Sequence, residues 1–268
     1  MTEHDKNNDN ISKNPKVGLA LGGGGVRGGA HIGVLKVLEE YGIKIDLLAG
    51  TSAGAAVAAL YAYGYKAKQL EEIYAKTDVI DLLRLRPTKK GLVTPSGYSR
   101  IISQYTDNGK IEDTKIPLYI VATDLISRKQ VIFDSGDIVT AVTASSAIPG
   151  MMPPVRHEGM LLSDGGILNN CPCDVLRNHG ADIILAVNLS CIANFEPKNT
   201  VDIVFRAMDI ITDHSEQSVH ADWIISPIDV PVGILERHMI EKSMRMGEKT
   251  ARANIESLLS LLKENDLR

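Results

Sequence analysis

The sequence predicts an α/β fold built on a mostly parallel sheet, because strand and helix patterns alternate along its N-terminal part. Residues 16–21 have the apolar pattern of a short buried strand, and residues 30–40 carry apolar side chains at helical spacing. Residues 43–49 form a second strand pattern, and the small-residue run 55–60 follows it as a second helix. This order implies parallel strands joined by right-handed crossovers.

Length and composition indicate one globular domain. The chain has 268 residues, of which 44% are hydrophobic, 23% charged and 4% aromatic. Because α/β folds of roughly 200–250 residues often form one unit, we expect a single domain over residues 16–268 behind a disordered polar tail at residues 1–15. The net charge of −4 and the lack of a lysine and arginine block argue against a nucleic-acid partner.

We expect a cytoplasmic protein. The tail lacks the apolar core of a signal peptide, and no run of about 18 uncharged apolar residues predicts a transmembrane segment. Cys171, Cys173 and Cys191 are odd in number, which fits reduced thiols inside a cell. The C-x-C spacing of the first two has no second ligand pair, so we expect structural cysteines, no metal and no cofactor.

Gly50-Thr51-Ser52-Ala53-Gly54 joins the second strand pattern to the second helix. A G-x-S-x-G sequence at such a turn is typical of a nucleophile elbow, where a strained serine needs small neighbours so that strand and helix can pass closely. Gly50, Ala53 and Gly54 meet this requirement. An ordinary tight turn would have a similar composition, so the pentapeptide alone leaves both interpretations open.

A glycine-rich loop over residues 22–29 joins the first strand to the first helix. Backbone N–H groups at a helix N-terminus favour negative charge. The spacing Gly23-x-Gly25-x-x-Gly28 also fits a dinucleotide-binding loop, which would need an acidic residue at the carboxyl end of the second strand. Asp46 lies near the start of that strand, so we interpret the glycines as donors to a transient oxyanion.

A serine nucleophile needs a base. None of the seven histidines follows a recognisable strand end, and His31, one turn into the first helix, is expected to pack or to cap. Asp164 is the better candidate, because the strand pattern 160–163 ends there and the two following glycines allow a close backbone approach. Asp124 and Asp134 also end strand patterns and are rival bases.

The middle and the end of the chain predict structure more than function. Residues 78–87 are amphipathic and precede two lysines. The basic segment 84–90 could form a lid or contact anionic lipid. We favour a third interpretation, in which it is the solvated edge of a core helix. Further strand patterns cover 183–189 and 223–227. A helix with methionines at core positions is expected over 234–263.

Five segments in order carry a family resemblance: Gly23-Gly24-Gly25-Val26-Arg27-Gly28, the elbow at Ser52, Ala144-Ser145-Ser146-Ala147-Ile148-Pro149, the D-G-G motif at Asp164, and Asn169-Asn170-Cys171-Pro172. Together they make the chain resemble the patatin-like phospholipase family over roughly residues 16–174. Plant members begin the glycine loop with Asp where this chain has Gly22, which points to the compact bacterial branch.

The resemblance implies a three-layer fold, with a central, mostly parallel sheet flanked by helices, and a Ser-Asp dyad in place of a triad. Asp164 would accept the proton of Ser52, which would attack an ester carbonyl and form an acyl-enzyme. Burial beside Ile167 and Leu168 would raise the pKa of Asp164 above its reference value of about 3.9.

The remaining site residues have supporting roles under this resemblance. The oxyanion would be held by the backbone N–H groups of Gly24, Gly25 and Val26. Arg27 would either fix the loop through carbonyl groups, which we favour, or meet a substrate phosphate. The motifs would be supported by Gly23, Arg27, Gly28, Gly50, Gly54, Gly165 and Gly166.

The expected activity is hydrolysis of acyl esters of lipids, lysolipids or small molecules, with transient contact to a membrane surface. Acyl transfer to an acceptor other than water would have the same sequence signature. Two other classes stay open: a catalytically weak regulatory or scaffold protein on the same fold, and a nucleotide-binding enzyme.

Overall fold

The computed structural model describes residues 15–76, 85–88, 91–93, 96–190, 196–197, 200–213, 220–229 and 239–266, with side chains omitted over 77–98 and at scattered positions of 200–219. Residues 1–14 of the expected tail, the side chains of the basic segment 84–90 and Cys191 therefore lie outside the described residues. The prediction for each of these parts stays a prediction.

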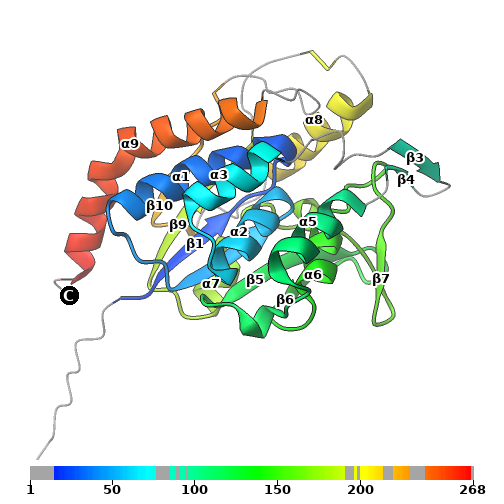
Figure 1. Cartoon of the computed structure of the whole chain (residues 1–268), viewed down its shortest axis with the longest axis horizontal. Coiled ribbons are helices and arrows are strands. Elements are labelled where there is room, and N and C mark those ends of the chain that lie inside the picture. The colour runs from blue at the N-terminus through cyan, green and yellow to red at the C-terminus, as the bar shows by residue number, and fades with distance from the viewer. Residues whose placement is uncertain are drawn as a thin grey trace, which may run out of the picture.

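The described residues form an eight-stranded mixed sheet at the centre of the molecule (Figure 1). Its order is β10-β9-β1-β2-β5-β8-β7, and β6 pairs with β5 off this path. The parallel strands are β1 (Val17–Leu21), β2 (Leu47–Thr51), β5 (Leu118–Asp124), β9 (Ile183–Val187) and β10 (Trp223–Ile225). The antiparallel ones are β6 (Lys129–Phe133), β7 (Val155–His157) and β8 (Met160–Asp164). A separate hairpin pairs β3 (Leu85–Thr88) with β4 (Gly91–Val93).

Helices cover both faces of the sheet, which confirms the expected three-layer α/β fold. Leu19 and Leu21 of β1 belong to the larger core, whereas Ala20 belongs to a smaller core on the opposite face. The larger core includes α1 (Gly29–Glu40), α2 (Ala53–Tyr63), α3 (Ala67–Lys76), α5 (Ser96–Thr106), α6 (Ile138–Ser145) and α9 (Met239–Asp266). The smaller core is covered by α7 (Cys173–Asn178), and α8 (Thr200–Asp213) packs near the short helix η3 (Gly165–Ile167).

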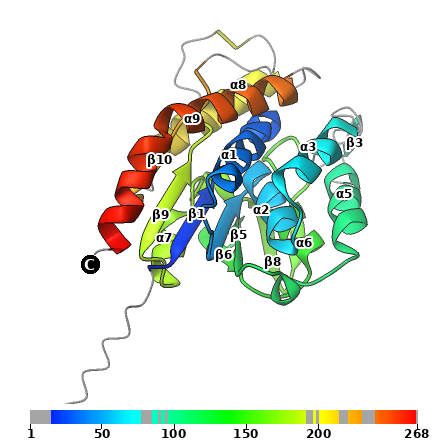
Figure 2. The same cartoon turned by 60° about the vertical axis from the view of Figure 1, so that its left-hand side comes forward.

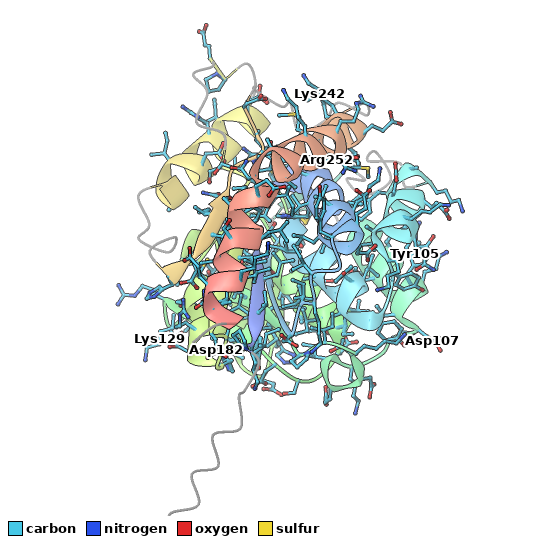
Figure 3. All side chains as sticks on the ribbon, turned by 90° about the vertical axis from the view of Figure 1, so that its left-hand side faces the viewer. Tyr105, Asp107, Lys129, Asp182, Lys242 and Arg252 are labelled. Atoms are coloured by element: carbon cyan, nitrogen blue, oxygen red, sulfur yellow. The ribbon has the colours of Figure 1, made fainter. Side chains whose placement is uncertain are left out.

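Helix α9 lies along α1 in both views of the molecule (Figures 1 and 2). A Cβ atom at Gly33 would overlap the carbonyl oxygen of Met244, so the two backbones touch. Ion pairs of 3.0 Å between Lys36 and Glu248 and of 2.6 Å between Arg252 and Glu40 flank this contact (Figure 3 labels Arg252). Met244 is buried there, as predicted for a core methionine.

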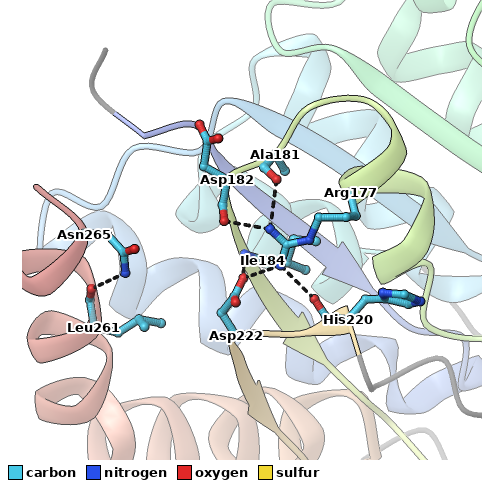
Figure 4. A network of polar contacts seen from close by, with 8 residues as sticks. All are labelled: Arg177, Ala181, Asp182, Ile184, His220, Asp222, Leu261 and Asn265. Carbon is cyan, nitrogen blue, oxygen red and sulfur yellow. Dashed lines mark hydrogen bonds and ion pairs between the residues drawn. The ribbon is translucent and has the colours of Figure 1, made fainter. Parts of the chain in front are cut away.

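An ion-pair network fastens α7 to the amino ends of β9 and β10 (Figure 4). The Arg177 guanidinium donates hydrogen bonds to the carbonyl oxygens of Ala181, Asp182 and His220 and to the Asp222 carboxylate, the last at 2.7 Å. Asp222 Oδ2 also accepts the N–H of Ile184 at 2.7 Å. This network sets the register of the two outermost parallel strands at the amino end of the sheet.

No helix within the described ranges is both long and apolar enough to cross a bilayer.

Candidate active site

Strands β2 and β8 meet end to end along one edge of β5. Thr51, the last residue of β2, lies opposite Val121, and Asp164, the last residue of β8, lies opposite Ala122. Both strands occupy the same edge, because β6 pairs with β5 on its other edge over these residues. Since β2 is parallel to β5 and β8 is antiparallel, their carboxyl ends point at each other, and Ser52 is brought to Asp164.

Ser52 has the strained backbone of a nucleophile elbow. Its φ of 54° and ψ of −120° lie in a region that non-glycine residues rarely adopt. A Cβ atom at Gly50 would lie 2.7 Å from the Ala55 Cα, and one at Gly54 would overlap the Leu21 carbonyl oxygen. The small residues therefore allow β2, the turn and α2 to pass closely, and this strained turn has the backbone that a nucleophile elbow requires.

The backbone N–H of Ser52 donates a 2.8 Å hydrogen bond to the side-chain hydroxyl of Ser145. Ser145 is the last residue of α6 and is fully buried. This hydroxyl holds the strained turn from the side of the neighbouring helix. It also occupies the N–H of Ser52, so that group is not a donor to substrate in this arrangement.

Asp164 is buried, and its Oδ1 accepts the N–H of Gly166 at 2.8 Å. Burial raises the pKa of Asp164 from 3.8 to about 6, against the lowering effects of the Gly166 N–H and of the nearby Ser52 side chain. A carboxylate of this kind is a stronger base than an exposed aspartate.

The backbone next to Asp164 is closely packed. A Cβ atom at Gly165 would overlap the Val121 carbonyl oxygen and lie 3.0 Å from the Thr51 Cγ2. Gly165 therefore lets the end of β8 lie directly against β5 and β2. Ile167 is half-buried and Leu168 is 41% exposed, and their expected part in burying Asp164 stays a prediction.

The glycine loop lies against the nucleophile. A Cβ atom at Gly23 would come within 3.1 Å of the Ser52 Cβ, and one at Gly28 within 2.9 Å of the Ala53 Cβ. Gly25 has a φ of 58°, which favours glycine. Among the described residues, none accepts a hydrogen bond from the backbone N–H groups of Gly24, Gly25 and Val26.

Arg27 holds the loop from inside the protein. Its Nε donates to the Gly24 carbonyl oxygen at 3.1 Å, and its two terminal nitrogens donate to the Asp209 carboxylate at 3.1 and 2.8 Å. Both side chains are buried, and Asp209 comes from α8. This is the carbonyl-fixing arrangement favoured for Arg27, and its link to α8 was not predictable from the sequence.

The alternative bases occupy other roles. His31 is fully buried, and its Nε2 is 2.7 Å from the Gly22 carbonyl oxygen, which agrees with the expected packing role. Asp124 accepts hydrogen bonds from its own hairpin turn and from the N–H of Leu161, and these bonds, led by that of Ser127, lower its pKa to about 2. Asp134 is exposed and accepts from the Ser135 hydroxyl.

The arrangement does not favour the dinucleotide alternative. Asp46 lies at the amino end of the sheet, where its carboxylate accepts the N–H of Val17 at 3.0 Å. Within the described ranges no three His, Cys, Asp or Glu side chains come together in a way that could hold a metal ion.

Ser145 and Asn170 are residues whose roles the sequence did not predict. Their segments only carry part of the family resemblance.

Comparisons with known proteins identify a family and a shared fold. The model of the patatin-like phospholipase family matches residues 19–177. Patatin-like phospholipase domain-containing protein 6 of Mus musculus is 38% identical over 181 residues, which cover 65% of this chain and 13% of the mouse protein. An uncharacterised NTE family protein of Mycobacterium bovis is 38% identical over 185 residues, covering 67% of this chain and 50% of that protein. This chain thus spans half or less of each relative.

Two solved structures share the fold. VipD from Legionella pneumophila has a TM-score of 0.60 at 14% identity, covering 94% of this chain and 67% of that one. Human GIVD cytosolic phospholipase A2, in complex with methyl gamma-linolenyl fluorophosphonate, has a TM-score of 0.55 at 12% identity, covering 95% and 59%. At these identities the likeness concerns the fold alone.

Proposed function

This chain belongs to the patatin-like phospholipase family, and we propose that it is a serine acyl hydrolase in which Ser52 is the nucleophile and Asp164 the base. The observation that carries the proposal is a serine at a strained elbow whose strand ends opposite Val121, next to the buried carboxylate of Asp164 opposite Ala122. Beside them lie the backbone N–H groups of Gly24, Gly25 and Val26, for which the described residues offer no acceptor. Family membership and these contacts together support hydrolysis of lipid acyl esters.

The first half of the reaction forms an acyl-enzyme. Asp164 takes the hydroxyl proton of Ser52 while Ser52 Oγ bonds to the ester carbonyl carbon. The carbonyl oxygen becomes an oxyanion and accepts hydrogen bonds from the N–H groups of Gly24, Gly25 and Val26. The carbon–oxygen bond to the alcohol then breaks, and the proton on Asp164 passes to the leaving oxygen.

The second half releases the acid. Asp164 takes a proton from water, whose oxygen attacks the acyl carbon and forms a second oxyanion in the same N–H cradle. The bond to Ser52 Oγ breaks, and the proton returns to Ser52. A base with a pKa of about 6 suits both steps, because it is ionised at neutral pH and still accepts a proton better than an exposed aspartate.

The natural substrate in this proposal is an acyl ester presented at a lipid surface. Ile203 and Ile210 are 57% and 51% exposed, lie on the same side of α8, and belong to the helix that packs near η3, directly after Asp164. Exposed apolar side chains beside a site favour contact with an apolar phase. A cytoplasmic location is part of the proposal.

The direct test uses a short-chain nitrophenyl ester and a fluorophosphonate probe. We expect the wild type to hydrolyse the ester and to carry the probe on Ser52, as mapped by mass spectrometry. Ser52→Ala should abolish both, and Asp164→Asn should lower kcat by about 10³-fold or more. Full activity in both variants would overturn the dyad. A folded but inert wild type that binds a partner tightly in a pulldown would overturn the hydrolase proposal and favour a regulatory or scaffold role.

The lipid surface has a separate test with phosphatidylcholine vesicles. We expect the double variant Ile203→Asp/Ile210→Asp to lose vesicle hydrolysis about tenfold while keeping its activity on the soluble ester. Tyr41→Asp is the matched control, because Tyr41 is 46% exposed at the end of α1, near the amino end of the sheet. Equal losses in both proteins would contradict a role for this face of α8.

A further inference from the structure

Three consecutive carbonyl groups of the glycine loop each receive a hydrogen bond from a buried side chain. His31 Nε2 is 2.7 Å from the oxygen of Gly22, and Arg27 Nε is 3.1 Å from that of Gly24. Between them, Asn170 Nδ2 is 3.4 Å from the oxygen of Gly23. The three side chains come from α1, from the turn of η1 and from the segment before α7.

These contacts fix where the N–H groups of the loop point. A peptide unit is planar and trans, so its N–H points away from its own C=O. The bonds to the Gly22, Gly23 and Gly24 oxygens thus orient the N–H groups of residues 23, 24 and 25. The first donates to the Asn170 carbonyl oxygen at 3.1 Å, and the next two have no acceptor among the described residues.

A run of glycines cannot hold such an orientation by itself, because glycine lacks the steric restrictions of other residues. The same freedom lets the loop approach the Ser52 Cβ closely. Orientation of the free N–H groups must therefore come from groups outside the glycines. The three buried side chains are the groups that the structure places on the carbonyl side.

His31 is suited to this role as a neutral ring. A carbonyl oxygen only accepts, so Nε2 carries the hydrogen and Nδ1 does not. The described residues offer no hydrogen-bond partner to Nδ1. Complete burial lowers the pKa of His31 to about 4, so the ring stays neutral wherever Asp164 is ionised. Its one ring N–H is bonded to the Gly22 carbonyl oxygen, which fits a positioning role.

We propose that His31 is a positioning residue. It fixes the peptide unit between Gly22 and Gly23, and this anchors the loop in which Asn170 and Arg27 orient the N–H groups of Gly24 and Gly25 toward the developing oxyanion. This inference rests on the proposed function. It assigns the histidine an effect on the transition state alone, since the N–H groups bond most strongly to the charged oxygen. A histidine that only filled space would show no such preference.

The experiment compares His31→Leu, His31→Gln and His179→Leu with the wild type on the short-chain nitrophenyl ester. His179 is the matched control, because its Nδ1 is also 2.7 Å from a backbone carbonyl oxygen, that of Val175, but at the end of α7. We expect His31→Leu to lower kcat about 10–100-fold with KM within about twofold. His31→Gln, which keeps an N–H donor, should recover at least part of kcat, and His179→Leu should match the wild type.

The pH profile separates positioning from proton transfer. The acid limb should stay near pH 6 in every active variant, since Asp164 sets it. Three results would overturn the inference. The first is a wild-type kcat in folded His31→Leu, and the second is an equal loss of kcat in His179→Leu. The third is an acid limb whose pH changes when His31 is replaced. If His31→Leu does not fold, Asn170→Ala removes the neighbouring bond and should give the same kcat loss at unchanged KM; wild-type kcat there would also overturn it.

Failure of the inference and failure of the proposed function give different results. An inert wild type, or an active Ser52→Ala, refutes the hydrolase proposal whatever the His31 variants do. An active wild type that needs Ser52 but not His31 refutes only the positioning role.

Discussion

The two ends of the parallel sheet use aspartates in opposite ways. At the amino end, three aspartates each come one residue before a strand: Asp46, Asp182 and Asp222. Each accepts a hydrogen bond from a backbone N–H at or next to the start of the neighbouring strand. At the carboxyl end, Asp164 is the last residue of its strand, is buried and lies near the Ser52 side chain. The residue type is the same, and its surroundings decide the chemistry.

The difference extends to the backbone. At the amino end, N–H groups such as those of Lys16, Val17 and Ile184 are used to hold strands in register. At the carboxyl end, the N–H groups of Gly24 and Gly25 have no acceptor among the described residues. One end uses its polar groups for stability, whereas the other leaves N–H groups without a described acceptor, which costs stability and, in our proposal, keeps donors available to an oxyanion.

The largest expected difference between the two ends concerns glycine. Gly54→Ala should destabilise the protein by about 3 kcal/mol or more, because its Cβ would overlap the Leu21 carbonyl oxygen. Gly180→Ala, before β9, should cost only about 1–2 kcal/mol, because Gly180 has a φ of 86° but open space around its Cβ position. Denaturant unfolding of both variants measures the difference, and equal losses would refute it.

Asp164→Asn should stabilise the protein at neutral pH while removing its activity. The raised pKa means that ionising Asp164 costs the folded state free energy, and this cost grows as the pH rises from 3.8 through about 6. Removing it should gain up to about 3 kcal/mol at pH 8 and nothing below about pH 4.

Unfolding experiments at a series of pH values test this expectation. In the wild type, kcat/KM should rise with pH through about 6 as Asp164 loses its proton. A stability gain that is the same at pH 4 and pH 8 would show that burial of the charge is not the cause.

Ser145→Ala should lower the rate of fluorophosphonate labelling at Ser52 by about 10–100-fold, because the N–H of the strained elbow loses its acceptor. Ser146→Ala is the matched control. Ser146 is also buried, and its hydroxyl has no hydrogen-bond partner among the described residues. Similar labelling rates in the two variants would mean that the turn does not depend on this hydrogen bond.

The smallest expected effect belongs to the amino end. Asp222→Ala should lower the free energy of unfolding by about 1 kcal/mol, because Asp222 loses a half-exposed pair with Arg177 and leaves the N–H of Ile184 without its acceptor. Activity per folded molecule should not change. Thermal melting measures the stability, and active-site titration gives the activity per folded molecule. A loss of kcat would show that the amino end of the sheet affects the candidate site.

Local patterns predicted much of this molecule. Around Ser52, an apolar run predicts the strand, the small residues predict the tight turn, and a second run of small residues predicts the helix. Each of these patterns involves only residues that are close in sequence. The expected burial of Asp164 beside Ile167 and Leu168 stays a prediction. The close approach of Gly165 to Val121 and Thr51 had no local signal, because these residues are distant in sequence.

The roles of Ser145, Asn170 and Asp209 had no local signal. Each acts through one hydrogen bond or ion pair to a residue far away in the chain. A buried serine or asparagine in an apolar segment has the same sequence pattern whether or not it supports a site.

The sequence by itself determined the α/β class, the elbow, the glycine loop and the candidate pair Ser52 and Asp164, because these depend on local spacing and on residue size. Only the tertiary structure decided that β2 and β8 meet head to head on β5, which brings the pair together. The physical reason is that strand pairing and burial depend on which distant segments share an edge, and no local pattern encodes that choice.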